Sequence, residues 1–100
     1  METPMVYVHG TVTITKGFDT WRTMVEGSKA EMDSLGMKVL FAATEADDGT
    51  KLHVIIQFPD METAKTFSTR EDVTEKRREA GVLVETTVMT PLAEPMINIR

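Results

Sequence analysis

The chain has 100 residues, a net charge of −5 and no cysteine, which excludes disulfides, thiolate metal sites and thiol nucleophiles. The negative charge disfavours binding to nucleic acids and to anionic membranes, so neither is expected as a partner. The longest apolar run is far too short to span a bilayer, and we expect a cytoplasmic protein. A hydrophobic content of 41% supports one domain over residues 1–100, with a core in 5–90 and a tail in 91–100.

Apolar and polar residues alternate strictly over residues 5–14, which predicts a half-buried first strand. Asp19 is suited to cap the helix that follows, in which apolar side chains recur at three- and four-residue spacing from Phe18 to Gly36. This spacing predicts one long amphipathic helix that Gly27 weakens without breaking.

Residues 37–46 and 52–58 are predicted to form two antiparallel strands. Between them lies Asp47-Asp48-Gly49-Thr50, and an Asp-Gly pair flanked by alternating apolar residues is typical of a hairpin turn. The two strands should therefore be neighbours in the sheet.

Pro59-Asp60 is expected to begin a second helix that ends at Ala80-Gly81. Ser68 and Glu71 have the spacing of a capping box, which predicts a kink or restart there. The Val- and Thr-rich residues 82–90 form a predicted fourth strand, and residues 96–99 could add a short strand in the tail.

The predicted order is strand, helix, strand, strand, helix, strand. With right-handed crossovers, this order gives an α+β, ferredoxin-like βαββαβ domain whose four-stranded antiparallel sheet carries both helices on one face. The other face would show apolar side chains, Leu40, Ile55, Leu83 and Met89 among them. Because such a patch is costly in water, we expect this face to pair with a second copy as a homodimer.

The segment from Ile14 to Trp21, in which an aromatic-Asp-x-Trp pattern opens the first helix, resembles small dimeric α/β-barrel proteins. Further matches extend the resemblance from Met5 to Leu92. They are Asp47-Asp48, Val54-Ile55-Ile56, Glu62 to Phe67 and Ala80-Gly81-Val82. The chain is similar to the antibiotic-biosynthesis monooxygenases in this group, although Thr13 and Gly17 stand where other members often have His and Asp.

The resemblance implies a dimeric α/β barrel and, as one possible activity, oxidation of aromatic substrates without metal or flavin. It also includes haem-degrading relatives, which hold iron through a histidine on the second helix. Residues 61–80 contain no histidine, so haem degradation is not expected.

An apolar pocket between sheet and helices is one candidate site. Gly10 lies in mid-strand on the predicted helix-facing side, and its missing side chain leaves room for a ligand. The alternative is that glycine marks a bulge and that the surrounding methionines are simply core. The pocket residues would be Gly10, Trp21, Met24, Met32, Phe41 and Phe67.

A polar group on the opposite face is the second candidate site. It contains both histidines of the chain, and an imidazole in a partly closed cavity can act as an acid or base. The alternative is a set of hydrogen-bonded residues in a wet dimer interface. The group comprises Tyr7, His9, His53, Gln57 and Glu85.

The sequence contains no histidines or carboxylates at the spacing typical of metal ligands, and no phosphate-binding glycine loop. We therefore expect neither a metal nor another cofactor. The RNA-recognition fold shares the same element order and remains a third interpretation. His53 and Ile55 nevertheless occupy the positions of its stacking aromatics, and the charge is unsuitable.

We therefore expect a homodimeric α/β-barrel protein that binds a small, largely apolar molecule. The alternative is a cofactor-independent monooxygenase or isomerase that acts on an aromatic or polyketide-like substrate.

Overall fold

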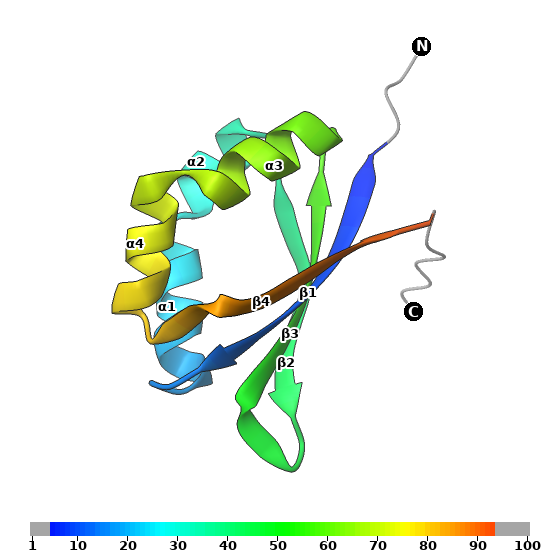
Figure 1. Cartoon of the computed structure of the whole chain (residues 1–100). Coiled ribbons are helices and arrows are strands. Elements are labelled where there is room, and N and C mark those ends of the chain that lie inside the picture. The colour runs from blue at the N-terminus through cyan, green and yellow to red at the C-terminus, as the bar shows by residue number, and fades with distance from the viewer. Residues whose placement is uncertain (1–4, 94–100) are drawn as a thin grey trace.

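The computed structural model describes residues 5–93 (Figure 1). Each predicted helix is a pair of shorter helices, and the strands fall close to their predicted positions. In chain order the elements are β1 (Val6–Ile14), α1 (Phe18–Gly27), α2 (Lys29–Ser34), β2 (Lys38–Glu45), β3 (Asp48–Phe58), α3 (Met61–Thr69), α4 (Glu71–Glu79) and β4 (Val82–Leu92). The short strand predicted at residues 96–99 lies outside the described residues.

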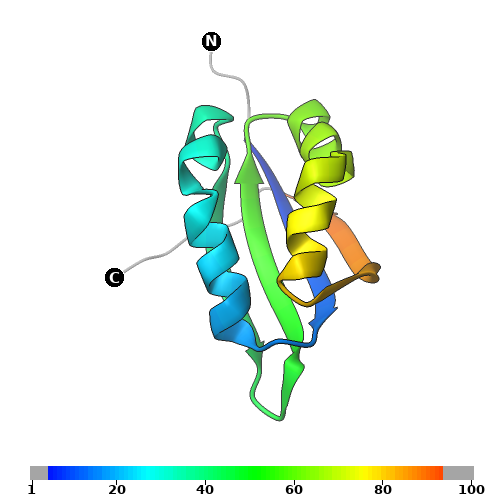
Figure 2. The same ribbon diagram turned by 90° about the vertical axis from the view of Figure 1, so that its left-hand side faces the viewer.

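The four strands form one antiparallel sheet in the order β2-β3-β1-β4. All four helices lie on one face of this sheet, in two columns formed by α1 with α2 and by α3 with α4 (Figures 1 and 2). This arrangement confirms the predicted α+β, ferredoxin-like fold. Among the described residues, no helix is both long enough and apolar enough to cross a membrane.

The first helical segment is broken at Ser28, so the prediction of one continuous helix was wrong. Ser28 has φ −103° and ψ 5°, and its hydroxyl donates to the Met24 carbonyl at 3.2 Å. A serine that bonds back to the preceding turn competes with the helical backbone pattern, and it follows Gly27, a weak helix former. The N-cap is Gly17, and Asp19 lies in the first turn instead of capping it.

The second helical segment restarts as predicted, but at Arg70, which has the extended backbone of φ −65° and ψ 135°. Ser68 is no cap, because its hydroxyl donates to the Ala64 carbonyl at 2.7 Å. At the beginning of this segment, Asp60 accepts a hydrogen bond from the Thr63 amide at 2.7 Å, which lowers the pKa of its carboxyl group. Asp60 is therefore the N-cap of α3.

The β2–β3 hairpin is present, but its turn is at residues 46–47, two residues before the predicted Asp48-Gly49 turn. Glu45 pairs with Asp48, so Gly49 already belongs to β3. The Asp48 carboxylate accepts bonds from the Thr50 hydroxyl and amide, which lower its pKa. This local bonding fixes the start of β3.

The β2 strand contains a register shift at Leu40. Val39 pairs with Ile56, and Phe41 pairs with the adjacent residue Ile55. Leu40 is therefore an extra residue in β2 that has no partner in β3. Since side chains alternate along a strand, the extra residue turns Phe41 to the face away from the helices, where it is 53% exposed. The prediction that Phe41 faces the helices was wrong for this reason.

A larger irregularity interrupts the pairing of β1 with β4. Thr11 pairs with Val88 and Thr13 with Leu83, which leaves residues 84–87 opposite a single residue of β1. The Thr86 hydroxyl accepts from the Thr13 amide at 2.9 Å and donates to the Leu83 carbonyl at 2.6 Å, so it replaces missing backbone bonds.

As a result, Met89 lies opposite Gly10, on the helix-facing side of the sheet. The expectation that Met89 lies on the open face was wrong. The expectation for Ile55 and Leu83 is confirmed, since their partners on β1 are His9 and Thr13.

The core consists of two clusters of buried side chains between sheet and helices. One packs around Trp21 of α1 with residues of β1, β3 and β4, and the other packs around Phe58 and Met37 with Ala64 of α3. Ile56 of β3 is in contact with both clusters. The space between the helix columns is therefore bordered by both parts of the core.

Gly81, which precedes β4, lies close to the backbone of Lys16, which follows β1. Its φ is +89°, and an added Cβ would lie 2.8 Å from the Lys16 amide nitrogen. Gly81→Ala should lower the free energy of unfolding by about 2 kcal/mol or more, because strain and backbone overlap combine.

Gly27→Ala is the matched control, because nothing lies near its Cβ position. It should leave the free energy of unfolding unchanged or raise it by up to about 1 kcal/mol. Urea unfolding followed by circular dichroism measures both variants. Equal stability of the two would contradict the close approach at Gly81.

Candidate functional site

A cavity of about 360 Å³ lies between the sheet and the two helix columns. Its floor is formed by β1 and β3, and its walls come from α1 and α2 on one side and from α3, α4 and β4 on the other. Figure 2 shows the two helix columns side by side over the sheet. Most lining side chains are apolar, and they include Val12, Trp21, Met24, Val25, Met32, Met37, Val39, Leu52, Val54, Ile56, Phe58, Phe67, Val73, Val84 and Met89.

Five of the six residues predicted to form an apolar pocket line this cavity. They are Gly10, Trp21, Met24, Met32 and Phe67. Phe41 does not line it, because the shift in β2 turns its side chain to the opposite face. The cavity thus brings together residues from both halves of the chain.

The space beside Gly10 is partly filled by a side chain that sequence reasoning placed elsewhere. A Cβ on Gly10 would lie 2.9 Å from Met89 Sδ and 3.2 Å from Val54 Cγ2. The glycine therefore makes room for the thioether of Met89, and both residues line the cavity.

Arg77 of α4 provides a positive charge in the cavity wall. Its side chain is half-buried, and its Nη2 donates a hydrogen bond to the Thr87 hydroxyl at 2.8 Å. Burial lowers the pKa of Arg77 from its ordinary value. Sequence reasoning missed this residue, although it follows the buried Val73 by four positions and so falls on the same helix face.

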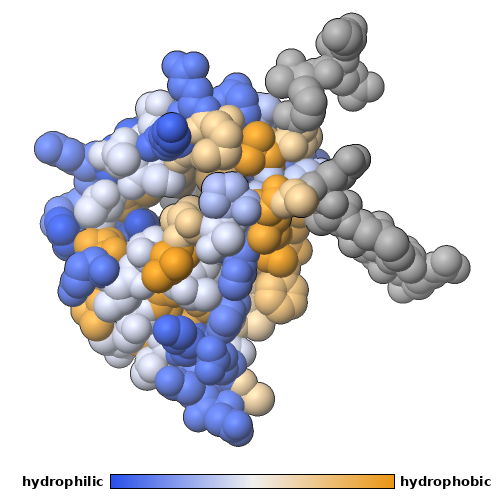
Figure 3. Space-filling model, turned by 45° about the vertical axis from the view of Figure 1, so that its right-hand side comes forward, coloured by the Kyte–Doolittle hydropathy of each residue, from blue (hydrophilic) through white to orange (hydrophobic). Residues whose placement is uncertain are grey.

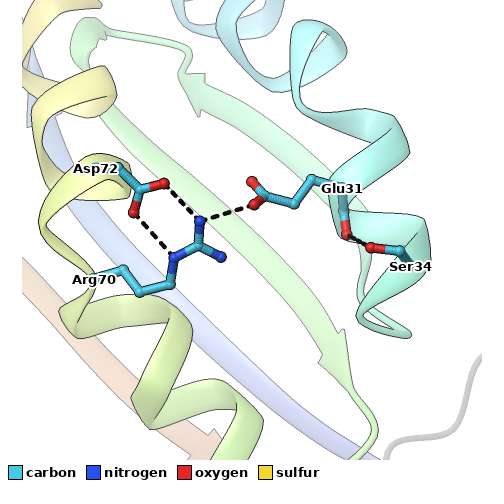
Figure 4. Close-up of polar contacts among 4 residues, drawn as sticks. All are labelled: Glu31, Ser34, Arg70 and Asp72. Carbon is cyan, nitrogen blue, oxygen red and sulfur yellow. Dashed lines mark hydrogen bonds and ion pairs between the residues drawn. The ribbon is translucent and has the colours of Figure 1, made fainter.

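An ionic bridge links the two helix columns (Figure 4). Arg70 donates to Glu31 of α2 at 2.8 Å and to both oxygens of Asp72 at 3.0 and 2.6 Å. Hydrogen bonds from Asp72 and then Glu31 raise the pKa of Arg70, and the same contact lowers that of Asp72. Glu31, the one carboxylate in the cavity lining, is thus already paired.

The second candidate site lies on the opposite face of the sheet. In the pairing of β1 with β3, Tyr7 lies opposite Gln57, His9 opposite Ile55 and Thr11 opposite His53. Tyr7, Gln57, His9 and His53 therefore share the helix-free face of the sheet. His9 Nε2 lies 3.2 Å from His53 Nδ1, and His53 Nε2 lies 2.8 Å from Glu45 Oε2. The rings are 13° from parallel with centroids 5.4 Å apart, which matches an edge-to-edge hydrogen bond.

These contacts define a chain of proton donors and acceptors. With a carboxylate at Glu45, His53 donates through Nε2 and accepts through Nδ1, so His9 donates through Nε2. The remaining nitrogen of His9, Nδ1, is then an acceptor. Such an arrangement can accept a proton from a substrate.

Glu85, the predicted acidic member of this group, has no ion pair or side-chain hydrogen bond within residues 5–93. It lies in the irregular segment of β4, and Glu45 takes the acidic position instead. Glu45 is two residues from Ala43, the partner of His53 in the hairpin. The hairpin pairing was therefore the signal that could have found it.

No group of three or more potential metal ligands occurs within the described part of the chain. The helix-free face also carries apolar side chains beside the polar group. Phe41, Leu83, Val88 and Leu92 pair with residues of that face and are 53%, 38%, 59% and 37% exposed. Figure 3 shows apolar surface gathered along this side of the sheet.

Residues 5–94 match a protein family described as "Domain of unknown function (DUF3764)". No curated protein matches the sequence closely enough to be named as a relative.

Several solved structures share the fold. A proposed antibiotic biosynthesis monooxygenase from Caulobacter crescentus CB15 superposes with a TM-score of 0.66 at 14% identity, covering 94% of this chain and 92% of that one. A second, from Deinococcus radiodurans, gives a TM-score of 0.61 at 16% identity, with coverages of 95% and 98%. A third, from Nitrosomonas europaea, gives 0.57 at 10% identity, with coverages of 94% and 93%. At these identities the likeness establishes the fold.

Proposed function

This chain belongs to the DUF3764 family, a domain family of unknown function, and we propose that it binds a small, largely apolar molecule in the cavity between its sheet and helices. The main support for this proposal is the cavity. A volume of about 360 Å³ lies within the range of small-molecule sites, which are apolar with a few polar groups. Here the polar groups include Arg77, Lys76, Thr87 and Glu31, and Glu31 is paired with Arg70 outside the lining.

The cavity is bordered by the two core clusters without being filled by them. The cavity is partly open to solvent, so its apolar lining contacts water when no ligand covers it. A ligand that occupies the space would bury this apolar surface and would stabilise the fold in proportion to its affinity. We propose that the protein performs this role in the cytoplasm.

Gly10→Val tests this proposal. The new methyl groups would meet Met89 Sδ and Val54 Cγ2, and the flexible thioether would be pushed into the cavity. Fluorescence titration with the neutral apolar probe N-phenyl-1-naphthylamine should show binding to the natural protein and at least about tenfold weaker binding to the variant.

His9→Ala is the control, because His9 lies on the other face of the sheet. It should leave the affinity for the probe unchanged. Overpacking at Gly10 can cost about 1 to 3 kcal/mol, so thermal melts must first show that the variant is folded. Probe binding that survives Gly10→Val and is lost in His9→Ala would move the site to the helix-free face.

We also propose that the protein is a homodimer whose helix-free sheet faces meet. Four large apolar side chains are exposed there, and a contiguous patch of this kind is typical of an interface. All four lie on the edge strands, Phe41 on β2 and Leu83, Val88 and Leu92 on β4. Dimerisation through this face would enclose both histidine groups and leave the cavity accessible from the helix side.

The double substitution Phe41→Glu with Val88→Glu should weaken the dimer at least about tenfold, because it places charges within the buried patch. Sedimentation velocity at micromolar concentration measures the effect. Met61→Glu is the control, since Met61 is a similarly exposed apolar residue on α3. A natural protein that sediments as a monomer, or a double variant that stays dimeric, would refute this interface.

A cofactor-independent monooxygenase is the second candidate function, and the His9–His53–Glu45 chain favours it. His9 Nδ1 would remove a proton from an activated CH₂ of an aromatic substrate. The substrate would supply the electrons to O₂, one oxygen atom forming the product C=O and the other leaving as water with the two hydrogens. The fold shared with proposed antibiotic biosynthesis monooxygenases agrees with this reading.

This activity predicts oxygen uptake with anthrone in metal-free buffer, measured with an oxygen electrode. His9→Ala should reduce the rate by about 10²-fold or more, the usual contribution of a general base. Glu45→Gln should reduce it less, because it removes only the group that orients His53. No uptake above the uncatalysed rate would exclude anthrone-type oxidation and leave the binding role.

A further inference from the structure

Arg77 differs from the other arginines of the described residues. Each of the others has a carboxylate within 4.0 Å, whereas Arg77 has none among residues 5–93, where its side chain makes one hydrogen bond, to the Thr87 hydroxyl. The pairs formed by the others are Arg22 with Asp19, Arg70 with Glu31 and Asp72, and Arg78 with Glu75.

Because Arg77 lies in the cavity wall, its guanidinium is available to a ligand that enters the cavity. A half-buried guanidinium loses part of its hydration, and a single neutral hydroxyl replaces only one of its five N–H donors. The nearby carboxylate that lines the cavity, Glu31, is bound by Arg70 at 2.8 Å and does not compete for Arg77. The wall beside Arg77 includes the apolar side chains of Val73, Val84 and Met89, and the second cation of the lining, Lys76, is exposed to solvent.

On this geometry, and resting on the proposed function, we infer that the cavity takes a small apolar molecule that carries one carboxylate, with Arg77 as the residue that binds the carboxylate. The planar guanidinium matches a carboxylate through two parallel hydrogen bonds. Thr87 orients the guanidinium through its hydroxyl. The apolar body of the ligand would then lie against Trp21, Met24 and Val54 on the far wall.

The test uses two probes of the same shape and different charge, 2-naphthoate and its neutral amide, 2-naphthamide. Isothermal titration calorimetry at pH 7.5 should show that the natural protein binds the carboxylate at least about tenfold more tightly than the amide. Arg77→Met keeps an unbranched apolar side chain and should abolish that preference without weakening amide binding. Arg78→Met, at an exposed neighbour paired with Glu75, should retain the preference.

Each outcome decides a different claim. Equal affinity of the natural protein for both probes would overturn the carboxylate inference and leave the binding role intact. Failure of both naphthyl probes and of N-phenyl-1-naphthylamine to bind would overturn the binding role as well. A preference retained in folded Arg77→Met would remove Arg77 as the anchor.

The comparison of probes on the natural protein requires no variant to fold. Thr87→Val provides an independent measurement, because it removes the hydroxyl that orients Arg77 while keeping the charge and the side-chain size. It should reduce the carboxylate preference severalfold and leave amide affinity unchanged. An unchanged preference would exclude the orienting role of Thr87.

Discussion

Side chains alternate between the two faces of a strand, so an odd number of extra residues in a strand transfers every later side chain to the opposite face. Two irregularities of this kind determine the surfaces of this protein. The shift at Leu40 places Phe41 on the open face, and the irregular segment 84–87 places Met89 against Gly10. The apolar cavity and the exposed apolar patch both depend on these two positions.

The sheet separates the two candidate sites. The cavity lies on its helix side, and the His9–His53–Glu45 chain lies on its open side, with β1 and β3 contributing to both. No single small molecule can contact both sites through a continuous sheet. A binding role in the cavity and proton transfer at His9 are therefore separate hypotheses that substitutions on one face can distinguish.

The sequence was sufficient to predict the order of strands and helical segments and the antiparallel sheet, because apolar periodicity reports burial directly, and five of the six predicted pocket residues do line the cavity. It was insufficient at Phe41 and Met89, since nothing in the local composition marks the added residues in β2 and β4. Ser28 and Ser68 show a related limit, because a serine hydroxyl can cap a helix or bond to the preceding turn. The acidic partner of His53 required the hairpin register, which placed Glu45 there and left Glu85 apart.

Four of the side chains around the cavity are methionines, namely Met24, Met32, Met37 and Met89. Methionine is unbranched and polarisable, so its thioether can follow the outline of whatever molecule it meets. A wall built in this way discriminates poorly between ligands of similar size and different shape. It also loses rotamer freedom when a ligand orders it, which opposes binding entropically. Selectivity in such a cavity would come from its fixed polar groups, and a series of related molecules could occupy it with similar affinity.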